Sequence, residues 1–225
     1  MKNTKISQTL DILTNIYNLS IKKPCQIERY LHHYFTEKIQ KDYPIYFEDI
    51  TKSKLHPEWA TANQYRENKG KYKKNEKKYE IDDDGTSGFI DFVLGDYNNP
   101  EIGIEFKSNS SWQFEPIVFD FMKLLDINNN LQTAISFSII YRKNGLSNKL
   151  TFETINNTIT EVKNRLKGRL NKDRPFIFWI VEIAYNNEKT NSWYCKNLDE
   201  KFIKGIPKFK EIKAVEINTS TQQLF

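Results

Sequence analysis

The stretch SGFIDFVLGDYNNPEIGIEFK, residues 87–107, decides the fold that we expect for this chain. Its two ends, 87–96 and 101–107, are rich in Ile, Phe and other apolar residues, a composition typical of β-strands. The letters NNP at 98–100 are typical of a turn. Two strands joined by so short a turn are expected to be antiparallel neighbours in one sheet.

Both strands carry charge among their apolar residues. Successive side chains of a strand point to opposite faces, so Asp91 should face away from one apolar row, and Glu105 and Lys107 from another. The rows are Ile90, Phe92 and Leu94 in the first strand, and Ile102, Ile104 and Phe106 in the second. Charged groups in apolar strands cost free energy unless they bind something. We therefore expect Asp91 and Glu105 to converge on one surface, with Lys107 beside them.

These residue types suit the hydrolysis of a phosphodiester with the help of a divalent metal ion. Mg²⁺ prefers oxygen ligands and keeps several waters, so one or two carboxylates suffice to hold it. Asp91 and Glu105 would supply them, with the backbone carbonyl of Phe106 as a third ligand. The ion neutralises the scissile phosphate and lowers the pKa of a bound water. Lys107 would orient or help to deprotonate that water and stabilise developing negative charge.

Asp91 in GFIDF and the triplet Glu105-Phe106-Lys107 in IGIEFK resemble the motif of the PD-(D/E)XK nuclease superfamily, best known from type II restriction enzymes. One departure is Ile90, which stands where the family has a proline. The resemblance implies Mg²⁺ as cofactor, with Mn²⁺ as a substitute. It also implies a further catalytic acid and metal ligand from the first core helix, a position that Glu28 matches.

The resemblance further implies the fold class. We expect an α/β (α+β) protein with a restriction endonuclease-like αβββαβ core, in which helices flank a central mixed sheet. The core would cover residues 24–143 and a C-terminal extension residues 144–225. Both would belong to a single nuclease domain over 1–225.

Apolar spacing predicts the other elements. We expect helices at 4–18, 24–39, 114–129 and 151–169, and strands at 45–50, 135–142, 175–185 and 211–217. The segment HPEWAT at 56–61 is expected to be a turn buried by Trp59. Residues 63–80 are expected to form a solvated loop or a frayed hairpin, and the residues around Trp193 a loop.

Residues 63–80 are also dense in lysine. Lysines bind phosphates by charge without reading sequence. The candidate nucleic-acid contacts are Lys71, Lys73, Lys74, Lys77 and Lys78, with Lys123 from the helix that follows residue 107. A merely solvated loop explains the same composition equally well.

Four residues on the expected helices have simpler interpretations. Asp120 and Lys123 lie three apart on a helix, where an ordinary ion pair is expected. His32 lies on the second helix at a spacing from His33 that suits no common metal motif, and we expect both to be partly exposed structural residues.

The pattern Glu-x-Lys also occurs at 67–69, 76–78, 161–163 and 211–213. The first two lie in the polar stretch and the third in an expected helix. The triplet at 211–213 lies in an expected strand, but the Asp199 that precedes it belongs to no strand pattern. Context therefore favours Asp91, Glu105 and Lys107.

The composition bounds the class of protein. The 225 residues are 38% hydrophobic and 14% aromatic, which excludes general disorder. Cys25 and Cys195 form no CxxC pattern, which argues against a zinc ribbon or a disulfide framework. We find neither a signal-peptide pattern nor an apolar run of the ~20 residues that cross a bilayer. A cytoplasmic protein without membrane association is expected, and its net charge of +5 suits a nucleic-acid partner.

The sequence thus predicts a Mg²⁺-dependent endonuclease that acts on nucleic acid, with double-stranded DNA as the expected substrate. Kinship adds a restriction or phage-defence role. Cutting both strands would favour a homodimer or a partner subunit, because one site cuts one strand. Two alternatives stay open: a non-catalytic nucleic-acid- or protein-binding module on the same fold, and an unrelated α/β interaction protein whose acids point apart.

Overall fold

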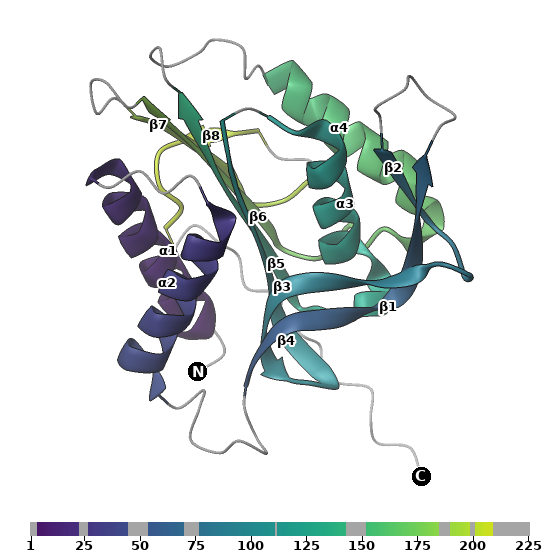
Figure 1. Ribbon diagram of the computed structural model, residues 1–225, viewed down its shortest axis with the longest axis horizontal. Coiled ribbons are helices and arrows are strands. Elements are labelled where there is room, and N and C mark those ends of the chain that lie inside the picture. The colour runs from purple at the N-terminus through teal and green to yellow at the C-terminus, as the bar shows by residue number, and fades with distance from the viewer. Residues whose placement is uncertain are drawn as a thin grey trace.

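The computed structural model describes residues 4–22, 27–44, 54–69, 77–110, 112–142, 152–184, 190–198 and 201–208. In these ranges the chain forms three layers, a mixed eight-stranded sheet with helices on both faces (Figure 1). A mixed α/β fold with a central sheet flanked by helices is thereby confirmed.

The helices are α1 (Thr4–Lys22), α2 (Glu28–Asp42), α3 (Phe114–Leu125) and α4 (Phe152–Leu166), with 3-10 turns η3 (Ile127–Asn129) and η4 (Lys167–Arg169). The strands are β1 (Leu55–Lys69), β2 (Lys77–Ile81), β3 (Thr86–Asp96), β4 (Asn99–Asn109), β5 (Thr133–Arg142), β6 (Phe176–Ala184), β7 (Thr190–Cys195) and β8 (Ile203–Lys204). Their order across the sheet is β2-β1-β3-β4-β5-β6-β7-β8. The ladders β4–β5 and β5–β6 are parallel and the others antiparallel.

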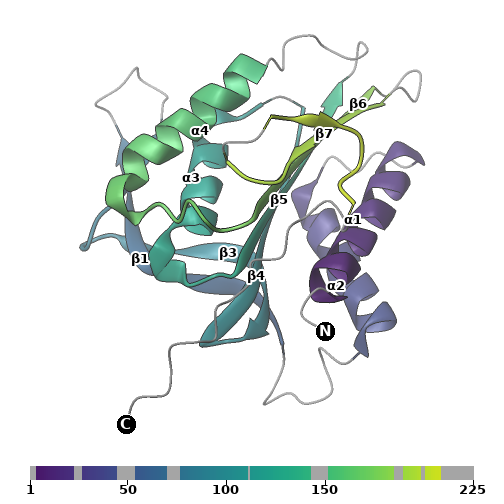
Figure 2. The ribbon, with the colours of Figure 1, turned by 180° about the vertical axis from the view of Figure 1, so that it is seen from behind.

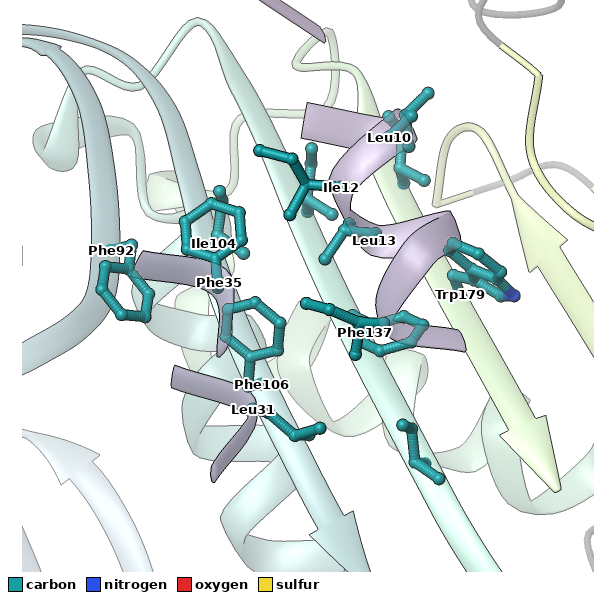
Figure 3. Close-up of a cluster of buried hydrophobic side chains, with 14 of the residues drawn as sticks. Leu10, Ile12, Leu13, Leu31, Phe35, Phe92, Ile104, Phe106, Phe137 and Trp179 are labelled. Carbon is teal, nitrogen blue, oxygen red and sulfur yellow. The ribbon is translucent and has the colours of Figure 1, made fainter. Parts of the chain in front are cut away.

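Helices α1 and α2 cover one face of the sheet. Their apolar residues at helical spacing pack on the aromatic row of β3 to β6 (Figure 3). Phe35 of α2 lies between Phe92 and Phe106, with ring centroids 5.0 and 5.4 Å away. Because β4 contributes Phe106 to this face, its alternate residues Glu105 and Lys107 are directed elsewhere.

Helices α3 and α4 cover the other face, as the view from behind shows (Figure 2). Phe121 of α3 packs edge-on against Phe176 and Phe178 of β6. Every residue of β6 is buried, the pattern expected of a strand covered on both faces. The buried β4–β5–β6 centre therefore supports Glu105 and Lys107, which lie on β4.

The two strands that decide the fold are confirmed as the antiparallel pair β3 and β4, which turn at Tyr97 and Asn98. The strands expected at 135–142 and 175–185 and the helices expected at 4–18 and 151–169 are also confirmed, within a few residues. The helix expected to end at 129 ends at Leu125. Asp126 takes an extended conformation there and accepts a hydrogen bond from the amide of Asn128, which starts η3.

The expected alternation along β3 is wrong at Ile90. Phe92 and Leu94 lie in the core under α1 and α2, whereas Ile90 packs with Trp59 and Val93 on the opposite side. The change of side falls at Asp91, between Ile90 and Phe92. Strict period-two alternation therefore does not hold through the residue of greatest interest.

The turn expected at 56–61 is wrong, because these residues belong to strand β1. Of the two alternatives for residues 63–80, the described part forms the hairpin, an antiparallel pair of β1 and β2, rather than a solvated loop. Glu58 has a φ of 49°, and the register with β3 shifts between Ala60 and Gln64, so two irregularities hide the strand period. Tyr65 is buried and Tyr79 stacks on Phe119 of α3. These tyrosines pack the hairpin onto the protein.

The loop expected around Trp193 is also wrong, because Trp193 pairs with Ile180 of β6 within β7. The strands expected at 45–50 and 211–217 and the helix start expected at Pro24 lie outside the described residues. None of the described helices combines the length and the apolar character needed to cross a membrane.

Candidate active site

The site lies where β3 and β4 part. Their ladder begins at Phe92 and Ile104. Beyond that point, among the described residues, each strand is paired on its other edge alone, β3 with β1 and β4 with β5. Asp91 and Glu105 are the residues just beyond the parting point. The amide of Phe106 donates a hydrogen bond of 2.7 Å to Oδ2 of Asp91, which holds this carboxylate between the two strands.

Helix α2 brings two further ligand types to Asp91. Glu28 and His32 are four residues apart on it and so lie on one side. One ligand atom each from Glu28, His32 and Asp91 lie within 4.8 Å of one another. The His32 ring is held by Phe92 and Phe106, at centroid distances of 5.3 and 5.5 Å. All three residues are half-buried, and we call this group of three the α2–β3 ligand group.

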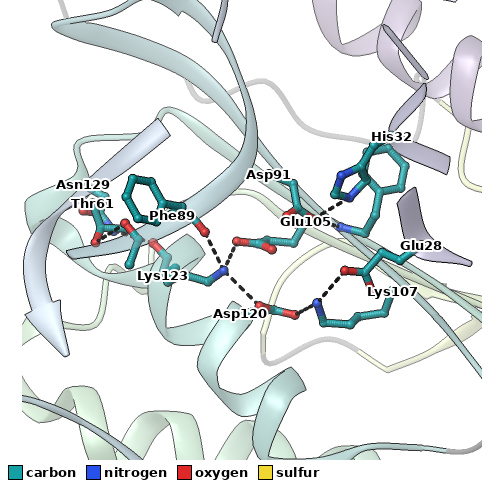
Figure 4. A network of polar contacts seen from close by, with 12 residues as sticks. Glu28, His32, Thr61, Phe89, Asp91, Glu105, Lys107, Asp120, Lys123 and Asn129 are labelled. Carbon is teal, nitrogen blue, oxygen red and sulfur yellow. Dashed lines mark hydrogen bonds and ion pairs between the residues drawn. The ribbon is translucent and has the colours of Figure 1, made fainter. Parts of the chain in front are cut away.

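Glu105 lies deeper and points to helix α3 (Figure 4). Its side chain is 1% exposed, and its Oε1 lies 2.5 Å from the ammonium of Lys123. Among the described residues, its Oε2 has no hydrogen-bond partner. Asp120 accepts the same ammonium at 3.0 Å. The i, i+3 pair expected between Asp120 and Lys123 is therefore present, but it is buried and joined to Glu105.

Lys107 connects the two parts of the site. Its ammonium lies 3.0 Å from Oδ2 of Asp120 and 3.3 Å from Oε1 of Glu28. A continuous series of opposite charges thus runs from Glu105 through α3 to the N-terminus of α2 (Figure 4). This network connects Glu28, Lys107 and Glu105 through Asp120 and Lys123. Asp91 lies beside Glu28 and His32, and the group of three that it forms with them does not include Glu105.

Burial and neighbouring charges shift the pKa values of three acids of the site. Complete burial and the charges of Asp120 and Asp91 raise the pKa of Glu105 well above its ordinary value. Burial also raises the pKa of Glu28. Burial alone would raise the pKa of Asp91, but the contact with His32 and the Phe106 amide outweigh it and lower the pKa.

The two lysines are firmly charged. Burial alone would lower the pKa of Lys107, but the four surrounding carboxylates, Asp120 foremost, outweigh burial and raise it. The pKa of Lys123 is raised in the same way by Asp120 and Glu105. With all four carboxylates ionised and His32 neutral, four acids against two ammonium groups give the cluster a net charge of −2. A single divalent cation carries the charge that would balance it.

The lysines predicted to contact nucleic acid are placed differently. Lys71, Lys73 and Lys74 lie outside the described residues, as does the side chain of Lys77. Lys78 lies 3.6 Å from Glu80 and 3.8 Å from Glu161 of α4. Lys123 is buried among protein oxygens, which contradicts its expected role as a surface phosphate contact.

Sequence reasoning missed His32 as a ligand and Lys123 as a member of the site. Two signals were present. His32 follows Glu28 by one helical turn, and Lys123 stands between Met122 and Leu124, which are both fully buried. A lysine in such a run needs a partner.

We compared the chain with family models, curated proteins and solved structures, and none of them matches it. Any function assigned to the site therefore has to be inferred from the geometry of its residues.

Proposed function

We propose that this protein is a metal-dependent nuclease of the PD-(D/E)XK type, which hydrolyses phosphodiester bonds at the cluster around Asp91, Glu105 and Lys107. The observation that carries the proposal is the uncompensated charge. Four carboxylates and two ammonium groups meet where two strands part, and the deepest acid, Glu105, has an oxygen without a hydrogen-bond partner among the described residues. Buried charges of this kind are stable only when something else balances them.

The element order supports a restriction endonuclease-like core. Helix α2, strands β1, β3 and β4, helix α3 and strand β5 follow one another as αβββαβ, with β2 added as a hairpin at the sheet edge. The acid from the first helix, the acid of β3 and the acid–lysine pair of β4 lie at equivalent places in that scheme. We therefore propose that these elements form a restriction endonuclease-like core.

The donors fit a divalent ion. Glu28, His32 and Asp91 would hold it. The sequence motif adds Glu105 and the Phe106 carbonyl as further expected ligands. When bound, the ion neutralises the phosphate and makes a bound water more acidic. The donor set contains one imidazole nitrogen, which suits Mn²⁺ at least as well as Mg²⁺. Mn²⁺ is therefore the first ion to test, with Mg²⁺ beside it.

Lys107 would serve as a fixed positive charge rather than as a base. Its raised pKa keeps it protonated at neutral pH, so it can donate hydrogen bonds to a phosphate oxygen but has no lone pair to accept a proton. Negative charge that develops on the phosphate would be stabilised by this preorganised donor. Asp120 holds the ammonium in place at 3.0 Å.

Nucleic acid, with double-stranded DNA first, is the proposed substrate, and a homodimer or a partner subunit would supply a second site. The net charge of +5 supports this class, because the site itself is acidic and the positive excess lies elsewhere. Phosphates would be attracted by the whole protein and balanced locally by the metal ion.

The test is a cleavage assay on plasmid, linear and single-stranded substrates with Mn²⁺ or Mg²⁺. Wild type is compared with Asp91→Ala and Lys107→Ala, and with Lys38→Ala and Asp42→Ala as matched controls. The controls remove an exposed pair near the far end of α2. Cleavage by wild type and both controls but by neither site variant supports the proposal. Cleavage unaffected by the site substitutions overturns the site, and metal binding without any cleavage favours the non-catalytic module.

A further inference from the structure

The ammonium of Lys123 is surrounded in a way that an ion pair does not require. It lies 2.5 Å from Oε1 of Glu105 and 3.0 Å from Oδ1 of Asp120, and it donates a hydrogen bond of 2.7 Å to the backbone carbonyl of Phe89. Three oxygens thus match the three N–H donors of an ammonium group. They come from three different elements, β4, α3 and β3.

Two carboxylates and a backbone carbonyl are also the donors that hard divalent cations take in proteins. The carbonyl matters most here. A carboxylate pairs with any nearby cation, but the Phe89 carbonyl, two residues before Asp91, can face a positive centre only because β3 and β4 have parted. The arrangement is an oxygen cage with a lysine nitrogen at its centre.

The aliphatic part of the Lys123 side chain is buried along its path to the three oxygens. The side chain is 6% exposed and its ammonium lies 5.0 Å from the centroid of the Phe119 ring. Gly88 lies beside the aliphatic stem, because a Cβ at this position would lie 3.0 Å from the Tyr65 ring and 3.2 Å from Cδ of Lys123.

We propose that the Lys123 ammonium takes the place of a second divalent cation, so that this site binds one metal ion rather than two. The inference rests on the proposed function for the first ion, which the α2–β3 ligand group would hold. Lys123 then acts as a positioning residue. It fixes Glu105 and Asp120, and through Asp120 it fixes the ammonium of Lys107.

Charge balance favours one ion. With Lys123 in place and all four carboxylates ionised, the cluster carries −2, the charge that one divalent cation neutralises. Without the lysine it would carry −3, and the vacated oxygens of Glu105, Asp120 and Phe89 would face one another. A second cation would relieve that repulsion.

The experiment counts bound Mn²⁺ by calorimetry and by the electron paramagnetic resonance signal of the free ion, without nucleic acid. Wild type is expected to bind one ion, Lys123→Met two, and Lys123→Arg one. Adding Asp120→Asn to Lys123→Met removes a cage ligand and should return the count to one. Lys38→Met, the same chemical change at an exposed pair, should leave the count at one.

A purely structural role for Lys123 predicts a different result, because loss of the ion pair would then lower stability without adding a binding site. A count that does not rise in folded Lys123→Met overturns the proposal, and so does a wild type that binds two ions. Far-UV circular dichroism checks folding. If the Met variant does not fold, Lys123→Gln replaces it, since its amide can still donate to the Phe89 carbonyl.

Failure of the proposed function has its own signature. A wild type that binds no Mn²⁺ and cleaves no substrate refutes the nuclease. One ion gained by Lys123→Met in that case would still assign the cage to a cation. Equal counts for wild type and the Met variant refute the cage, whatever the cleavage assay shows.

Discussion

Two buried acid–base groups lie on the same sheet and differ in charge balance. In the first, Glu182 of β6 receives two N–H groups of Arg142 at 3.1 and 2.9 Å, one acid against one base. In the second, the candidate site, four acids face two lysines. An oxygen without a hydrogen-bond partner among the described residues occurs in both, Glu182 Oε2 and Glu105 Oε2. Charge balance, rather than the orphan oxygen, therefore distinguishes a structural pair from a binding site.

The largest expected effect is on the balanced pair. Arg142→Met leaves the fully buried Glu182 without its base and frees the Ser110 carbonyl from a hydrogen bond. We expect the free energy of unfolding to fall by about 3–5 kcal/mol, as for other broken buried pairs. Urea unfolding followed by circular dichroism measures it. Cleavage per folded molecule should not change, and a loss of cleavage there would place Arg142 in the site.

The next effect is on catalysis. Lys107→Ala removes the preorganised charge, and we expect kcat to fall roughly 10²–10³-fold, the range seen when a transition-state donor is lost. Unfolding should change much less than in Arg142→Met, because removing a base here leaves acids that a metal ion can balance. Steady-state cleavage with Mn²⁺ and urea unfolding in Mn²⁺ test the two halves. A variant that loses stability but keeps kcat would make Lys107 a structural residue.

A smaller effect concerns the identity of the metal. His32→Ala removes the only nitrogen in the α2–β3 ligand group. We expect affinity for Mn²⁺ to fall by on the order of 10-fold and affinity for Mg²⁺ to fall less, because imidazole suits the transition metal better. Calorimetric titration of both ions measures the ratio. His33→Ala, next to it on α2, is the matched control, and an equal change in both variants would remove His32 from the ligands.

The sequence predicted those parts of the molecule that depend on local pattern. Strands β3 and β4, and the position of Asp91 against β4, followed from apolar runs and a tight turn. Strand β1 did not, because the positive φ of Glu58 and the register shift after Ala60 erase its period. Ile90 lies on the other side from Phe92 in the part of β3 that pairs with β1 but no longer with β4.

The rest of the site depends on how helices sit on the sheet. His32, Asp120 and Lys123 join it only because α2 and α3 pack on opposite faces and meet where β3 and β4 part. No spacing along the chain encodes that meeting. The sequence carried two hints, the one-turn spacing of Glu28 and His32 and a lysine within the apolar run 121–125.

The smallest expected effect is on the stability of Glu105→Gln, and here the sign of the change decides. Glu105→Gln keeps the shape of the side chain and its contact with Lys123 but removes its negative charge. Burial and neighbouring acids disfavour that charge, because they raise the pKa of the Glu105 carboxyl. In EDTA we expect this variant to be more stable than wild type by ~0.5–2 kcal/mol. Glu182→Gln, the same change in the balanced pair, should instead be less stable, because Arg142 loses its counter-charge. Thermal unfolding at pH 7 compares them, and Mn²⁺ should stabilise wild type more than Glu105→Gln. Equal destabilisation by both substitutions would mean that Glu105 is neutralised within the protein, so that the excess negative charge calls for no metal ion.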